Sequence, residues 1–72
     1  MTQPTPLMRV NGESVPYRAG SVMDLLQSSE IDPRARGIAV AVNGAIVPRG
    51  AWSTQFLNEG DEVEIVGAVQ GG

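Results

Sequence analysis

Residues 38–47 read Ile-Ala-Val-Ala-Val-Asn-Gly-Ala-Ile-Val, and this stretch decides how the rest of the chain can fold. Its first five side chains form a continuous apolar run, which is typical of a strand buried on both faces. The dipeptide Asn43-Gly44 follows and favours a tight hairpin, because both positions tolerate positive φ. Residues 38–42 are therefore predicted to form the central strand of a sheet, and residues 45–47 to return beside it as far as Pro48.

A helix is predicted on the N-terminal side of this strand. Ser21 is a good N-cap, and Asp24 stands three residues later, in a variant of the capping box. Three apolar residues recur at i, i+3 and i+4 and form one stripe: Val22, Leu25 and Leu26. The helix should run from residue 22 to about residue 29. Asp32-Pro33 should stop it, because the residue before proline is disfavoured in the α region.

Two strands are predicted before the helix. Residues 7–10 and 14–18 flank Asn11-Gly12, which is a second hairpin signal. Val15 and Tyr17 share one face of the second strand. Pro16 cannot donate a backbone hydrogen bond, so this strand should lie at an edge of the sheet.

The last strand is predicted at residues 62–66, after the turn sequence Asn58-Glu59-Gly60-Asp61. Its side chains alternate, so that Val63 and Ile65 face the core while Glu62 and Glu64 face solvent.

The predicted order is strand, strand, helix, strand, short strand and strand. One helix laid across one face of a mixed sheet buries both apolar surfaces of a 72-residue chain most simply. The predicted fold class is therefore α+β, with the β-grasp (ubiquitin-like) architecture. Residues 1–6 should be a disordered lead-in, residues 7–66 the folded domain, and residues 67–72 a flexible tail ending in Gly-Gly.

Composition excludes most catalytic classes. The chain has no cysteine and no histidine, which removes thiolate catalysis, cysteine metal sites and the usual general base. We predict no catalytic and no metal-binding residue. The net charge is −3 and the five arginines do not cluster in the sequence, so no nucleic-acid partner is expected. No apolar run reaches the length of a membrane span and no signal peptide is recognised, which predicts a cytoplasmic protein.

The chain ends at Gly71-Gly72, which provides an unhindered terminal carboxylate on a narrow segment. Such a segment suits a protein whose own C-terminus is the substrate of another enzyme. Four carboxylates precede it, and they either form a solvated face or guide the tail toward a basic partner surface: Glu59, Asp61, Glu62 and Glu64. Trp52 is predicted to be a core side chain. Arg49 could stack on Trp52 or pair with Glu59 or Asp61.

Residues 43–52 carry the run Val-Pro-Arg-x-x-Trp, and they resemble the signature of the ThiS-type sulfur carriers of thiamin biosynthesis. Residues 57–66 and 68–72 are also similar to the closing pattern of that family. The resemblance covers the chain after its lead-in.

This resemblance implies a carrier and not an enzyme, with no cofactor bound to the chain itself. A ubiquitin-activating-type adenylyltransferase would use ATP to adenylate the carboxylate of Gly72. A persulfide sulfur donor would then convert it into a thiocarboxylate, and thiazole synthase would accept the sulfur. Two alternatives stay open, namely a sulfur carrier for molybdopterin synthesis and a ubiquitin-like interaction module whose tail does not react.

Overall fold

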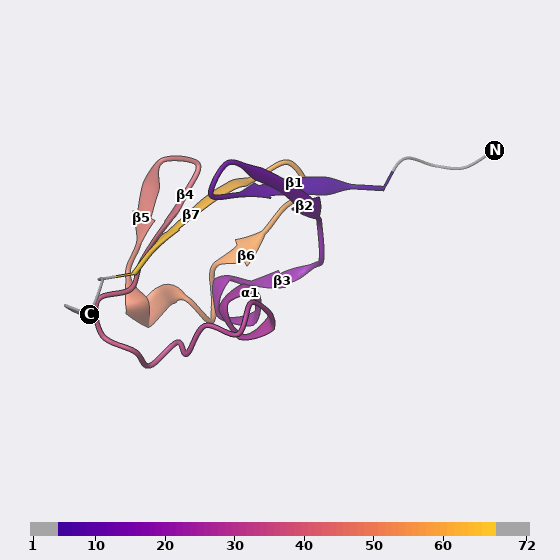
Figure 1. Ribbon diagram of the computed structural model, residues 1–72. Coiled ribbons are helices and arrows are strands. Elements are labelled where there is room, and N and C mark those ends of the chain that lie inside the picture. Colours follow the sequence, from indigo (N-terminus) through magenta and orange to yellow (C-terminus); the bar gives the residue numbers. More distant parts are fainter. Residues whose placement is uncertain (1–4, 68–72) are drawn as a thin grey trace.

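The structure is a computed structural model that describes residues 5–67. In this part of the chain, a mixed sheet is crossed by one α-helix, as the sequence predicts (Figure 1). The elements in chain order are β1 (Leu7–Val10), β2 (Glu13–Pro16), β3 (Gly20–Ser21), α1 (Val22–Ser28), β4 (Ala39–Val42), β5 (Ala45–Val47), the 3₁₀ turn η1 (Arg49–Ala51), β6 (Phe56–Leu57) and β7 (Glu62–Val66).

The sheet has the strand order β2-β1-β7-β4-β5, with β1 and β7 parallel and the other pairs antiparallel. The prediction that residues 38–42 form the central strand is wrong, because β7 occupies the centre. The prediction of burial on both faces is also wrong. Val40 and Val42 are buried, whereas Ala39 is exposed and Ala41 is half-buried. The helix covers only one face of the sheet, so the apolar run has small residues on the other face.

The start of α1 follows the predicted capping box. The Ser21 hydroxyl accepts a hydrogen bond from Asp24 N, and an Asp24 carboxylate oxygen accepts one from Ser21 N at 2.9 Å. Val22 and Leu26 are fully buried, and Leu25 is partly buried against the same core.

The helix ends at Ser28, one residue from its predicted end and four residues before Asp32-Pro33. Glu30 adopts a φ of 61°, and the backbone N–H groups of Glu30 and Ile31 donate to the carbonyls of Gln27 and Leu26. These two bonds form a Schellman motif, which closes a helix through a left-handed residue. A glutamate holds the position that glycine usually takes, and the sequence therefore lacks the usual signal.

The core lies between α1 and the inner face of the sheet. It contains nine buried apolar side chains: Met8, Val22, Leu26, Val40, Val42, Val47, Trp52, Leu57 and Val63. Trp52 is 1% exposed, which confirms its predicted place in the core. The segment between β5 and β7 contains η1 and also β6, which pairs with β3 in a small second sheet beside α1 (Figure 1).

Both Asn-Gly hairpins form, with positive φ at each of the four residues. The second strand is Glu13–Pro16, shorter than predicted, and it lies at the sheet edge that Pro16 requires. Val15 and Tyr17 are both partly buried against the core, in agreement with the prediction that they share one face.

The two hairpin asparagines also hold the central strand. The Asn11 side-chain oxygen accepts a hydrogen bond from Ile65 N at 2.8 Å, and the Asn43 side-chain oxygen accepts one from Glu62 N at 2.9 Å. Each asparagine thus joins a turn to β7, a role beyond the turn geometry that its sequence indicates.

Candidate functional site

The candidate site is the end of β7, where the chain continues toward its C-terminus. β7 lies between β1 and β4, and its last residue, Val66, is in register with Ala39 of β4. Gly67 is the last residue that the structure describes, so the predicted reacting residues Gly71 and Gly72 lie outside the described residues. β7 pairs with β1 at Glu62 and Val63 and with β4 as far as Val66, so pairing with β4 holds the start of the tail against the body.

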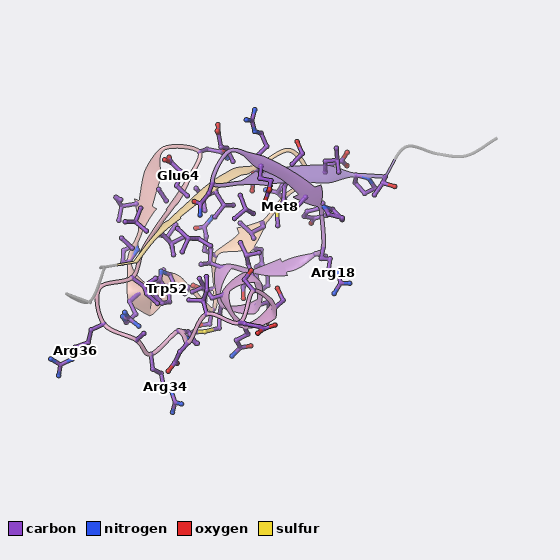
Figure 2. The ribbon with its side chains drawn as sticks, viewed as in Figure 1. Met8, Arg18, Arg34, Arg36, Trp52 and Glu64 are labelled. Carbon is purple, nitrogen blue, oxygen red and sulfur yellow. The ribbon has the colours of Figure 1, made fainter. Side chains whose placement is uncertain are left out.

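The outer face of the sheet meets this point. Ala41 is in register with Glu64 on one side and with Ile46 on the other, so these three side chains share one face. Ile46 is 72% exposed and Val66 is 62% exposed. Glu64 is exposed, and it extends from the outer face in Figure 2. The face therefore combines exposed apolar side chains with the Glu64 carboxylate close to the tail, while Glu62, in register with Arg9, lies toward the other end of β7.

Glu62 and Glu64 face solvent on β7, as predicted from the alternation. Glu59 is exposed but lies in the turn that precedes β7, where the next residue, Gly60, donates its N–H to the carbonyl of Leu7. From Glu62 to Gly67 the strand rises about 16 Å. Glu59 is therefore at the opposite end of β7 from the tail.

Asp61 does not lie on the exposed surface. It is 9% exposed, and its carboxylate oxygens accept hydrogen bonds from the Asn43 side chain at 3.0 Å and from Asn58 N at 2.8 Å. Asp61 thus closes the turn before β7 and connects it to the β4–β5 hairpin. In the sequence Asp61 shares only its charge with the acidic residues around it, whereas the turn geometry directs its side chain inward.

Arg49 stacks on Trp52, one of the two arrangements that the sequence allowed. The guanidinium carbon is 4.5 Å from the centroid of the indole ring. The guanidinium also donates hydrogen bonds to the carbonyls of Pro33 and Ala35, and the Trp52 indole N–H donates to the carbonyl of Val47 at 3.0 Å. The Val-Pro-Arg-x-x-Trp run thus joins the end of β5 to the α1–β4 loop.

The open cleft between α1 and the β1–β2 hairpin has a volume of about 890 Å³. Its walls include Val15, Arg18, Asp24 and Leu25. It lies at the β2 side of the sheet, whereas the tail leaves beside β4, so this cleft is not part of the tail site.

Residues 5–67 contain no cluster of three or more carboxylate, histidine or cysteine side chains arranged to hold a metal ion. No helix among these residues is long and apolar enough to cross a membrane. In the described part of the chain, the features that favour a function are the exposed sheet face and the fixed start of the tail.

Comparison with known proteins agrees with this geometry. The model of the ThiS family matches residues 4–72, nearly the whole chain. The chain belongs to the ThiS family. The sulfur carrier protein ThiS of Escherichia coli (strain K12) is 33% identical over 63 residues, which cover 86% of this chain and 92% of that protein.

Two solved structures of a thiamine biosynthesis protein from Geobacter metallireducens are also similar. The crystal structure, of a protein described as ThiS, has a TM-score of 0.76 at 26% identity and covers 92% of this chain and 99% of its own. The solution structure has a TM-score of 0.75 at 26% identity, over 92% of this chain and 87% of its own. These matches confirm the β-grasp fold and the family resemblance that the sequence indicated.

Proposed function

We propose that the carboxylate of Gly72 is the acyl site at which this chain carries sulfur for thiazole formation. Membership of the ThiS family makes the chain a sulfur carrier of thiamine biosynthesis, and so a protein co-substrate that binds no cofactor. The finer assignments, namely the reacting residue, the partners and the cytoplasmic location, are our proposal.

The proposed cycle begins with activation of the tail. The carboxylate of Gly72 attacks the α-phosphate of ATP in a ubiquitin-activating-type adenylyltransferase, which releases pyrophosphate and forms an acyl adenylate. Activation is required because a carboxylate is a poor acyl donor, whereas AMP is a good leaving group. The sulfur of a donor persulfide then displaces AMP and forms an acyl disulfide. A thiol of the partner cleaves its sulfur–sulfur bond, and the thiocarboxylate left on Gly72 passes to thiazole synthase.

The observation that best supports this proposal is the placement of β7 at the centre of the sheet. The strand is paired with β1 at Glu62 and Val63 and with β4 as far as Val66, and the five residues after Gly67 span at most about 18 Å when extended. A rigid body with such a tail can bind at the mouth of a narrow channel while its end reaches a buried reaction centre.

We assign the partner contact to the outer face of the sheet around Glu62, Glu64 and Ile46. Exposed apolar side chains rimmed by charge are typical of protein-binding surfaces. The two carboxylates would guide the tail toward a basic channel entrance. The activating enzyme needs positive charge there, because it brings together two anions, ATP and a carboxylate. Asp61 and Glu59 are left out of this surface, because Asp61 is buried and Glu59 lies in the turn before β7, outside the strand whose face carries Glu62 and Glu64.

Deletion of Gly72 tests the proposal. The truncated chain should melt at the wild-type temperature, because the core contains no tail residue among those the structure describes. It should support no ATP–pyrophosphate exchange with the cognate adenylyltransferase, because the carboxylate no longer reaches the α-phosphate. Exchange at the wild-type rate would overturn the assignment of Gly72. In protein isolated from its native cell, the intact mass should include a species with one oxygen replaced by sulfur at this residue.

A further inference from the structure

After Asp32 the charges of this chain are separated along the sequence, although the arginines look scattered. Between Pro33 and Asn58 there are three arginines and no acidic side chain, and from Glu59 to the end there are four acidic residues and no basic one. Two of these arginines, Arg34 and Arg36, lie in the loop between α1 and β4. Both are exposed, with 91% of the Arg34 side chain accessible. This basic loop, residues 32–37, was not identified as a candidate site from the sequence.

The basic loop is held in place by hydrogen bonds. Asp32 accepts two of them, from Arg34 N to its carboxylate at 2.9 Å and from Ala35 N to its carbonyl at 3.0 Å. The Arg49 guanidinium bonds to two carbonyls of the loop and stacks on Trp52. Because Arg49 donates to neutral carbonyls, these bonds do not neutralise the positive charge of the loop.

Asp32 is the one acidic residue of the loop. Its carboxylate is 3.6 Å from Arg34 Nε, and both side chains are largely exposed, so solvent screens this pair. The loop is thus an anchored segment that keeps a positive charge and presents two arginines to solvent.

This segment lies at the end of the sheet where the tail begins. Arg36 is three residues before Ala39, which is in register with Val66, and three Cα steps span at most about 11 Å. Figure 2 shows Arg34 and Arg36 extending away from the body, whereas Arg18 lies on the opposite side of the view. The start of the tail therefore has the basic loop on one side and Glu64 of the outer face on the other.

Arginines at this position would meet the partner's surface and not its reaction centre. When extended in a channel, the five residues after Gly67 span at most about 18 Å, which would separate the reacting carboxylate from the start of the tail. A guanidinium prefers carboxylate or phosphate partners, to which it donates two parallel hydrogen bonds. At the mouth of a protein channel, the matching groups are carboxylate side chains.

We propose that Arg34 and Arg36 form a second docking contact, which binds carboxylates at the rim of the tail-accepting channel of the activating enzyme. This inference rests on the proposed function and deepens it. Opposite charges on the two sides of the tail define one rotational orientation, because a carrier turned by half a revolution would place like charges against each other. A single acidic patch would attract the carrier without determining its orientation.

The test compares two variants with the same change in net charge. Arg34→Gln with Arg36→Gln lowers the net charge by two, and so does Arg18→Glu on the other side of the molecule. The measurement is ATP–pyrophosphate exchange with the cognate adenylyltransferase, with the KM for the carrier and kcat determined across a salt series. Melting temperatures of both variants verify that they fold.

We expect the Arg34→Gln/Arg36→Gln variant to raise KM about tenfold at low salt with kcat unchanged, because lost steering slows association. Arg18→Glu should leave KM within about twofold of wild type, and the difference should disappear near 1 M salt, where the Debye length is about 3 Å. Arg34→Glu with Arg36→Glu should raise KM further. Equal KM values for the Arg34→Gln/Arg36→Gln and Arg18→Glu variants would overturn the inference alone. Failure of the wild-type chain to support exchange would overturn the proposed function, and this inference with it.

Discussion

Leu26→Ala is the most direct test of how this small domain is stabilised. Leu26 is fully buried on α1, in the core that also contains Val40, Trp52 and Val63. The substitution removes three carbon atoms from the core, a transfer loss of about 2.4 kcal/mol at about 0.8 kcal/mol per methylene. The cavity left behind raises the expected loss to about 3–4 kcal/mol.

A loss of this size is large for the domain. At about 0.05–0.15 kcal/mol per residue, a chain of 72 residues has a total stability of about 4–11 kcal/mol. Leu26→Ala should therefore remove about a quarter or more of it and lower the melting temperature by at least about 12 °C. The free energy of unfolding is measured in urea from the fluorescence of Trp52, the only tryptophan of the chain and a buried one.

Leu25→Ala is the matched control, because the same atoms are removed from the adjacent, partly buried residue. It should cost about 1 kcal/mol. If Leu26→Ala costs less than Leu25→Ala, or lies within about 0.5 kcal/mol of wild type, the packing described for α1 is refuted.

Three further predictions concern the turns and the outer face. Asn43→Gly keeps the positive φ of the turn and removes the side-chain hydrogen bonds to Asp61 and to β7, so the free energy of unfolding in urea should fall by about 1–3 kcal/mol. A change near zero would contradict the role of this side chain. Glu30→Gly removes the backbone strain of a left-handed non-glycine residue at the end of α1 and should stabilise the chain by about 0.5–1 kcal/mol. A lower melting temperature would show that the helix end is not strained. Glu62→Gln with Glu64→Gln should slow stopped-flow association with the activating enzyme at low salt and have little effect at high salt; unchanged low-salt rates would reduce these carboxylates to a solubilising surface.

The sequence alone determined the features that depend on a few neighbouring residues. Ser21 and Asp24 specify the start of the helix because the cap is made within four residues. The two Asn-Gly pairs specify the hairpins because positive φ is a local requirement, and the alternation in residues 62–66 identifies the faces of β7. The Val-Pro-Arg-x-x-Trp run indicated the family, which the comparisons confirm.

Only the tertiary structure decided how distant segments meet. Four features join segments that are separated by many residues. They are the central place of β7, the inward direction of Asp61, the pairing of β3 with β6, and the hydrogen bonds from Arg49 to the basic loop. No local preference specifies such contacts, because they depend on which strands pair and on the space that the packed core leaves. The same reason explains why Arg34 and Arg36, unremarkable in the sequence, lie beside the start of the tail once β4 pairs with β7.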